Sequence, residues 1–177
     1  WLEPAIVNEW AALMQSYEAR YSSDVIFSAL RWEDERRDTQ TVRALIEQRL
    51  RSSDVRCVWT DRSLRRARYD VDHCFPWSRW PNNDLWNLLP ATSRANNDKR
   101  EKLPSADVLD RSRDRIMSWW ESEFVGTDRE SQFFAEAEAA LPMPTEAQRI
   151  ETIFEGVTQQ RMRLKMNQQL AEWHGLD

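Results

Sequence analysis

The apolar positions along most of the chain recur at helical spacing. In residues 4–21 an apolar side chain returns every three or four positions, and Pro4 suits the first turn of a helix. A charged stretch then separates a shorter predicted helix, over residues 24–32, from a helix that Asp38 or Thr39 can cap. Three further helices are predicted towards the C-terminus, over residues 105–124, 127–141 and 145–174.

The central part of the chain has a different periodicity. Residues 55–60 (VRCVWT) are β-branched and aromatic, and residues 67–73 (ARYDVDH) alternate in polarity, so the two segments are predicted to form a β-hairpin. Residues 75–84 contain two prolines and an asparagine pair, which indicate a loop. Residues 85–90 then return to a short extended run.

The last predicted element of the centre is a helix, which Thr92 or Ser93 can cap and which stops before Pro104. Only three glycines occur in 177 residues, fewer than a turn-rich sheet protein needs. The predicted fold class is therefore α+β and mainly α, within one compact unit. It consists of a helical N-terminal segment, a strand–loop–strand–helix core and a helical C-terminal segment, at residues 1–54, 55–105 and 106–177.

Charge is unevenly distributed along the chain. The formal net charge is −5, yet residues 56–102 carry ten Lys or Arg against six acidic residues. If the protein binds a polyanion, the contact is therefore expected at the centre, between acidic flanks. No apolar run is long enough to cross a membrane and no signal peptide is evident, so we expect a cytoplasmic protein without a membrane partner. Because the first residue is Trp1 rather than Met, we expect the sequence to be a piece of a longer protein.

Two cysteines, Cys57 and Cys74, are too few for a disulfide framework or a four-cysteine zinc site. With His73 they make only a scattered set of zinc ligands, so we expect buried free thiols and no structural zinc. The small central segment must then be supported by packing. We expect this support from the flanking helices and from the tryptophans at 59, 77, 80 and 86.

Polar residues with catalytic potential are concentrated in the same central segment. Asp72 and His73 end a predicted strand, Asn87 opens the next extended run, and Asn96 lies on the following helix, with Lys99 three residues on. Metal-dependent hydrolysis of a phosphodiester needs oxygen ligands for a hard cation, which carboxylate and amide groups supply. It also needs a general base, for which neutral histidine is suited near pH 7, and positive charge near the phosphate.

This arrangement resembles the HNH endonucleases, which have the ββα-metal fold. Their motif places a His, usually after an Asp, at the end of one strand, an Asn in the middle, and a His or Asn on the helix. Here DH at 72–73, Asn87 and Asn96 occupy those places. The stretch YDVDHxxP followed by N-x8-N-x2-K is similar to the HNH domains of RNA-guided CRISPR effector nucleases. The resemblance covers residues 55–105 and implies a ββα-metal nuclease core between helical segments.

The resemblance also implies roles for individual residues. His73 would be the general base that deprotonates the attacking water. Asp72 and Asn96 would bind one divalent ion, Mg²⁺ first, with Mn²⁺ or another divalent ion as alternatives. Asp70, on the same strand face as Asp72, would add a weak ligand or a supporting contact. Asn87 would be structural, holding the His73 segment in place.

Two of these assignments, both on the predicted helix that follows Thr92, have alternatives. Asn97 competes with Asn96 for the ligand position, although the spacing to Lys99 favours Asn96. The basic residues Lys99, Arg94 and Arg100 are expected to contact phosphate, and the alternative for Lys99 and Arg100 is a solvated helix face.

The predicted function is a metal-dependent HNH endonuclease that hydrolyses DNA by a one-metal mechanism. Because the flanks are acidic, another domain or protein subunit is expected to deliver the DNA. Phage defence, restriction and CRISPR-type effectors are all compatible settings. Two alternatives stay open. One is a catalytically silent nucleic-acid-binding or helical interaction module, and the other is an RNA-cleaving relative of the same fold.

Overall fold

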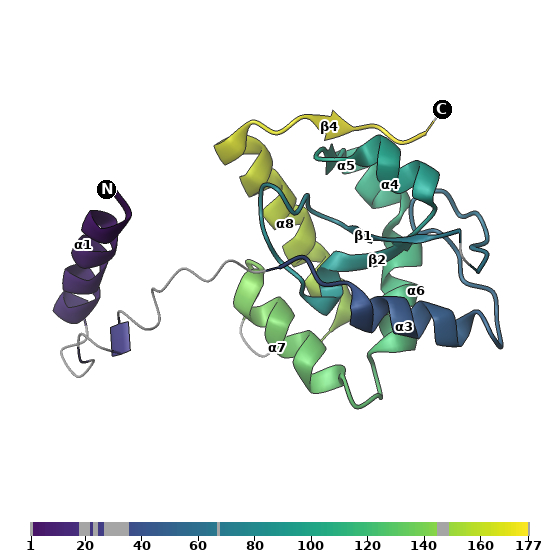
Figure 1. The fold of residues 1–177 in the computed structure, drawn as a ribbon, viewed down its shortest axis with the longest axis horizontal. Coiled ribbons are helices and arrows are strands. Elements are labelled where there is room, and N and C mark those ends of the chain that lie inside the picture. Colours follow the sequence, from purple (N-terminus) through teal and green to yellow (C-terminus); the bar gives the residue numbers. More distant parts are fainter. Residues whose placement is uncertain are drawn as a thin grey trace. The chain divides into compact units, whose positions relative to one another are not determined.

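The computed structural model describes residues 2–17, 22, 25–26, 36–66, 68–144 and 149–176, and the chain divides into two compact units (Figure 1). The first unit, residues 1–36, contains α1 (Leu2–Tyr17), on which Ile6, Trp10 and Leu13 are exposed. The helix predicted over residues 24–32 lies largely outside the described residues. In the parts of the chain that the structure describes, no helix is long and apolar enough to cross a membrane.

The second unit, residues 37–177, surrounds a short antiparallel pair of strands, β1 and β2, with helices (Figure 1). The mainly α, α+β class predicted from the sequence is confirmed. Its elements in chain order are α3 (Gln40–Arg49), β1 (Asp70–His73), the 3-10 turn η1 (Leu85–Asn87), β2 (Leu88–Ala91), α4 (Ser93–Lys99), β3 (Leu103–Pro104), α5 (Ala106–Arg111), α6 (Arg113–Glu123), α7 (Glu130–Ala140), α8 (Ile150–Gln168) and β4 (Glu172–Trp173).

The strand pairing differs from the predicted hairpin. β1 pairs with β2, with His73 opposite Leu88, and residues 55–60 form no strand. The latter segment is a buried, irregular stretch whose Val58 N–H donates to the Pro90 carbonyl at 3.0 Å. Its β-branched and aromatic residues therefore reflect burial against β2, because such residues suit any half-buried surface and do not by themselves specify a strand.

Thr92 caps α4, since its hydroxyl oxygen accepts a hydrogen bond from the Ala95 N–H at 3.3 Å. The helix ends at Lys99, earlier than predicted, because Arg100 adopts a φ of 51° that no α-helix continues. The chain then enters β3, which pairs in parallel with β4. The predicted helix over 145–174 is accordingly shorter and ends at Gln168, before β4.

Aromatic side chains support the loop between β1 and β2. The rings of Phe75, Trp80 and Trp86 contact one another in pairs, with centroids 5.5–5.9 Å apart. Trp86 is fully buried, and its carbonyl accepts a hydrogen bond from the Trp120 indole at 3.2 Å. Packing against α6 therefore stabilises the small central segment, in the way that the clustered tryptophans suggested.

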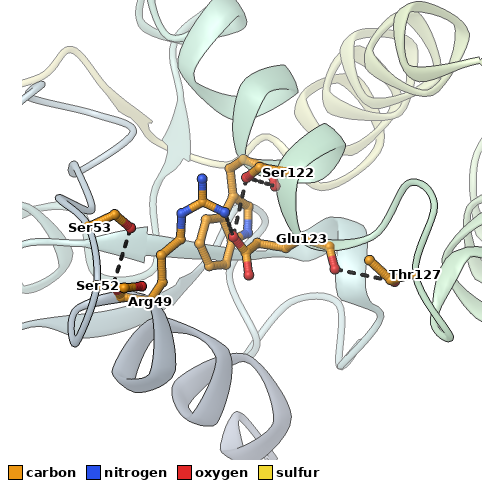
Figure 2. A network of polar contacts seen from close by, with 7 residues as sticks. Arg49, Ser52, Ser53, Ser122, Glu123 and Thr127 are labelled. Carbon is orange, nitrogen blue, oxygen red and sulfur yellow. Dashed lines mark hydrogen bonds and ion pairs between the residues drawn. The ribbon is translucent and has the colours of Figure 1, made fainter.

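A polar contact joins the ends of α3 and α6 (Figure 2). Arg49 forms an ion pair with Glu123, whose carboxylate is nearly buried and also accepts a hydrogen bond from Ser122 at 3.2 Å. α3 in turn contacts both β1 and β2. The ion pair thus fixes α3 against the body of the unit, and with it the residues just before α3 that reach the site described below.

Candidate active site

The end of β1 opens into a cavity of about 440 Å³, which we call the polar cavity. Asp72 and His73 line it from β1, and Asn96 and Asn97 line it from α4. Three of the residues predicted to act together, Asp72, His73 and Asn96, are therefore brought to one place. Within the described part of the chain, the lining residues are Arg37, Asp72, His73, Pro76, Trp77, Ser78, Asn96, Asn97, Arg100 and Glu101.

His73 is buried, with only 2% of its surface exposed, and its ring packs edge-on against Trp77 at 5.3 Å. Its Nε2 atom lies 3.4 Å from Asn83 Oδ1, whereas its Nδ1 atom is buried without a partner among the described residues. Burial lowers the pKa of His73 to about 4, the positive charge of Arg37 adds to this effect, and the contact with Asn83 opposes it. His73 is therefore neutral at pH 7, as a general base must be.

The protonated nitrogen of His73 follows from a second contact of Asn83. The backbone N–H of Asp38 donates to Asn83 Oδ1 at 2.9 Å. A backbone N–H only donates, so the Asn83 atom that faces it is the carbonyl oxygen, which only accepts. A hydrogen bond between the two side chains then requires the hydrogen on His73 Nε2, and this tautomer has its lone pair on Nδ1.

Asp72 is held from two sides. Its Oδ2 accepts a hydrogen bond from the Trp59 indole at 2.8 Å, and its Oδ1 pairs with Lys99 Nζ at 3.0 Å. Lys99 Nζ also donates to the His73 carbonyl at 2.7 Å. Burial raises the pKa of the Asp72 carboxyl, while the Lys99 charge and the two hydrogen bonds oppose this effect.

The expectation that Lys99 contacts phosphate conflicts with this position, because Lys99 is fully buried. It lies one helical turn after Ala95, which is also buried, so both point from α4 towards β1. Lys99 supplies the counter-charge of Asp72 and fixes the end of β1, and it does not lie on a face that nucleic acid can reach.

Asn96 and Asp70 form a hydrogen bond, in which Asn96 Nδ2 donates to Asp70 Oδ2 at 3.0 Å. Because the nitrogen of the amide is engaged, the carbonyl oxygen of Asn96 is the atom left to act as a ligand. Asp70 is not among the residues that line the polar cavity. Of the two roles expected for Asp70, its position therefore fits a supporting contact better than a weak metal ligand.

Asn87 is fully buried and bonds across the loop that follows β1. Its Oδ1 accepts from the Phe75 N–H at 3.0 Å, and its Nδ2 donates to the Asn82 carbonyl at 3.0 Å. The Asn87 carbonyl accepts from the Cys74 N–H at 2.7 Å. These bonds tie the residues directly after His73 to the start of β2, which agrees with a structural role.

The segment that supplies Asp72, His73, Asn87 and Asn96 is similar to a known protein family. Residues 57–105 match the family model of HNH endonucleases. These residues form an HNH domain. The family predicted from the sequence is thus confirmed, while the closer similarity to CRISPR effectors stays a prediction. No curated protein matches the chain, and no solved structure matches it.

The polar cavity is built from more than the HNH domain. Arg37, which precedes the domain by twenty residues, lines the cavity, and Asp38 orients Asn83. The sequence showed Arg37 only as part of a charged connector, and no local spacing relates it to His73. Of the two exposed arginines predicted to contact phosphate, Arg100 lines the cavity and Arg94 does not.

The donor atoms in the HNH domain fit a hard divalent ion. Among the described residues, no group of three or more His, Cys, Asp or Glu side chains is placed to hold a metal. Asp72 and Asn96 nevertheless bring carboxylate and amide oxygens to one cavity, and each Asp72 oxygen keeps a lone pair beyond its bond to Lys99 or Trp59. Two such oxygens suit a cation that keeps several water ligands, as Mg²⁺ does.

The cysteines take no part in this donor set. Both are free and buried, as predicted. Burial raises the pKa of the Cys74 thiol to about 12, so it is not a thiolate at neutral pH.

The protein should become less stable as the pH falls from 6.5 to about 4, because of His73 in the HNH domain. In the unfolded chain His73 takes up a proton near pH 6.5, whereas in the folded protein it stays neutral down to about 4. The unfolded state therefore binds more protons in this window, and His73 lowers the free energy of unfolding by up to about 3 kcal/mol. Urea unfolding across the window, without divalent ions, measures the effect.

Two variants isolate the contribution of His73 to this pH dependence. Asp72 and other groups titrate in all the proteins, so the difference between wild type and His73→Gln reports His73 alone. The exposed His174 serves as the control, and His174→Gln should keep the wild-type pH profile. Parallel profiles for wild type and His73→Gln would contradict the prediction.

Proposed function

We propose that this HNH domain hydrolyses DNA phosphodiester bonds, with His73 as general base and one divalent ion held by Asp72 and Asn96. The observation that carries the proposal is that a neutral histidine, whose Nδ1 has no partner among the described residues, lines the same cavity as two oxygen-donor side chains, Asp72 and Asn96. Buried polar atoms normally have partners. An unpaired lone pair at such a place is suited to accept a proton from water or substrate.

Each residue of the polar cavity contributes a separate part of this chemistry. His73 accepts the proton of the attacking water at Nδ1, while Asn83 binds the opposite side of its ring. A divalent ion bound by Asp72 and Asn96 would supply positive charge to the phosphate and the leaving oxygen. Lys99 opposes the rise in the pKa of Asp72 that burial causes and orients its carboxyl group, and Asn87 keeps the loop after His73 in register.

Phosphate binding is assigned to Arg37 and Arg100, which line the cavity and are exposed. Guanidinium groups match phosphate oxygens in pairs and stay charged at all relevant pH values. Because the chain as a whole carries a charge of −5, a further domain or subunit is proposed to deliver the DNA. A role in phage defence, restriction or a CRISPR-type effector rests on the sequence resemblance.

Removal of divalent ions should abolish cleavage. Supercoiled plasmid is incubated with the protein at low salt in Mg²⁺, in Mn²⁺ or in EDTA, and the products are separated on agarose. The nicked circle should appear before any linear form, because one active site cuts one strand at a time. A single-stranded RNA of the same length as a matched DNA strand is tested in parallel.

The outcomes of this experiment separate the alternatives. Cleavage that persists in EDTA would contradict the ion-dependent mechanism. Faster cleavage of RNA than of DNA would replace the proposed substrate by RNA. Binding of DNA without cleavage in any ion would favour the catalytically silent module.

A further inference from the structure

A second cavity, of about 580 Å³, lies outside the polar cavity and takes no part in the chemistry proposed above. Three arginines line it, Arg62 from the HNH domain, Arg111 from α5 and Arg115 from α6, and we call it the arginine cavity. Thr60 also lines it, and the Thr60 hydroxyl is buried without a partner among the described residues. The cavity thus gathers donors and has few acceptors.

The acidic residue that lines this cavity is directed elsewhere. The Asp61 carboxylate accepts a hydrogen bond from Arg56 Nε at 2.8 Å, and Arg56 is not among the lining residues. Asp61 stands in a left-handed turn, with φ of 58°, which brings the following Arg62 to the cavity wall. Among the described residues that line the cavity, the positive charge of the three arginines is therefore only partly balanced.

The arginines differ in how firmly they are held. Arg115 is fixed, because its Nε donates to the Val58 carbonyl at 2.6 Å and its Nη2 to Ser112 Oγ at 3.3 Å. Arg111 is paired, as far as the described residues go, only with the exposed Asp107 one turn before it, and such surface pairs contribute little. The Arg62 side chain has no partner among the described residues. Arg62 and Arg111 can therefore turn to a ligand at small cost.

The arginine cavity is linked to the polar cavity through the Trp59 side chain. Trp59 lines the arginine cavity, and its indole donates to Asp72, which lines the polar cavity. One hydrogen bond therefore joins a residue that lines the first cavity to a residue that lines the second. A strand whose scissile phosphate is at Asp72 and His73 has further phosphates along its length, since nucleic acid carries one per nucleotide.

We propose that the arginine cavity binds a backbone phosphate of the nucleic-acid strand away from the cleaved bond. Arg62, Arg111 and Arg115 provide the charge, and the Thr60 hydroxyl provides a further donor. Such contacts position a strand and carry no sequence information. The proposal deepens the proposed function, since it places a second contact with the same substrate.

The test measures DNA affinity as a function of salt, in the His73→Ala background so that no substrate is cut. Fluorescence anisotropy of a labelled duplex compares Arg62→Gln/Arg111→Gln with the parent. The double variant should bind DNA about tenfold more weakly at low salt. The magnitude of the slope of the logarithm of the association constant against the logarithm of the salt concentration should decrease by about 1 per arginine removed. The control is Arg149→Gln/Arg163→Gln, with the same charge change at two exposed arginines away from the cavity, one of them also in a weak surface pair.

An unchanged slope in Arg62→Gln/Arg111→Gln, or an equal loss in the control variant, would overturn the proposal. A second arm adds inorganic phosphate and follows backbone amide shifts of residues 59–62 by NMR. Phosphate binding there with an unchanged DNA slope would assign the site to free phosphate and would also overturn the proposal.

The kinetic and binding measurements distinguish failure of the proposed function from failure of the arginine-cavity proposal. In the active protein, Arg62→Gln/Arg111→Gln should raise KM with little change in kcat, because the cavity binds substrate without touching the reacting atoms. If the wild type cuts no substrate, the proposed function fails. The DNA affinity of Arg62→Gln/Arg111→Gln, compared with that of its parent, still tests the arginine-cavity proposal. A lower kcat with unchanged KM would contradict a contact that only binds the strand.

Discussion

Cleavage by the His73→Ala variant should be at least about 100-fold slower than cleavage by the wild type, while nucleic-acid affinity is retained. General bases contribute roughly 100- to 10,000-fold to the rate of the step they assist. His73 lines the polar cavity, its Nδ1 has no partner within the described part of the chain, and burial keeps it neutral at pH 7. Single-turnover nicking of plasmid in Mg²⁺ measures the rate, and anisotropy with a short duplex measures the affinity.

The matched control is the second histidine of the chain. His174→Ala removes an exposed ring outside the HNH domain and should cleave at the wild-type rate. Because His73 is buried, His73→Gln is tested beside the alanine variant as a closer fit to the space, and thermal unfolding shows that each variant is folded. A folded His73→Gln or His73→Ala protein with the wild-type rate would remove His73 from the mechanism.

Replacement of Lys99 by methionine should cost about 3–5 kcal/mol of stability, the usual loss when one partner of a buried ion pair is removed. Methionine has nearly the length of lysine but no charge, so Asp72 would lose its counter-charge, and the His73 carbonyl would lose a donor at 2.7 Å. Urea unfolding at neutral pH measures the loss. The nearby, less buried Lys102→Met should change stability by less than about 0.5 kcal/mol.

A double variant tests the cause of this loss. Lys99→Met/Asp72→Asn removes both charges, and the amide carbonyl introduced at position 72 can still accept from the Trp59 indole. The double variant should recover a large part of the stability lost in the single one, because no unpaired buried charge is left. If Lys99→Met and the double variant are equally unstable, packing of the lysine stem and not its charge explains the effect.

The central motif was predictable because its residues lie close together in the sequence. Asp72 and His73 at a strand end, Asn87 before the next strand, and Asn96 on a helix capped by Thr92 are local features, and each has a recognisable spacing. The long helices were predictable for the same reason, since their apolar periodicity is visible in one window.

Other features depend on contacts that no local pattern records. Residues 55–60 have the composition of a strand, but their backbone bonds go to residues 61–64 around one isolated bridge and to Pro90, so no ladder forms and the segment packs as an irregular stretch. Lys99 looked like a surface cation, and only the packing of α4 against β1 shows that its ammonium is buried. Arg37 precedes His73 by a long stretch of sequence, and Asn83, although only ten residues after His73, stood in the sequence as a residue of the loop, so neither had a signal that pointed to the site.

The C-terminal strand has a consequence for how this HNH domain can be transplanted. β4 pairs with β3 at the end of the domain, and Trp173 bonds to Asp98 on α4 at 2.7 Å and packs on Trp59 at 5.8 Å. The residues matched by the family therefore depend on contacts with the last residues of the chain. Grafting residues 57–105 alone into another scaffold would carry the motif without its support, and the portable module is the whole of residues 37–177.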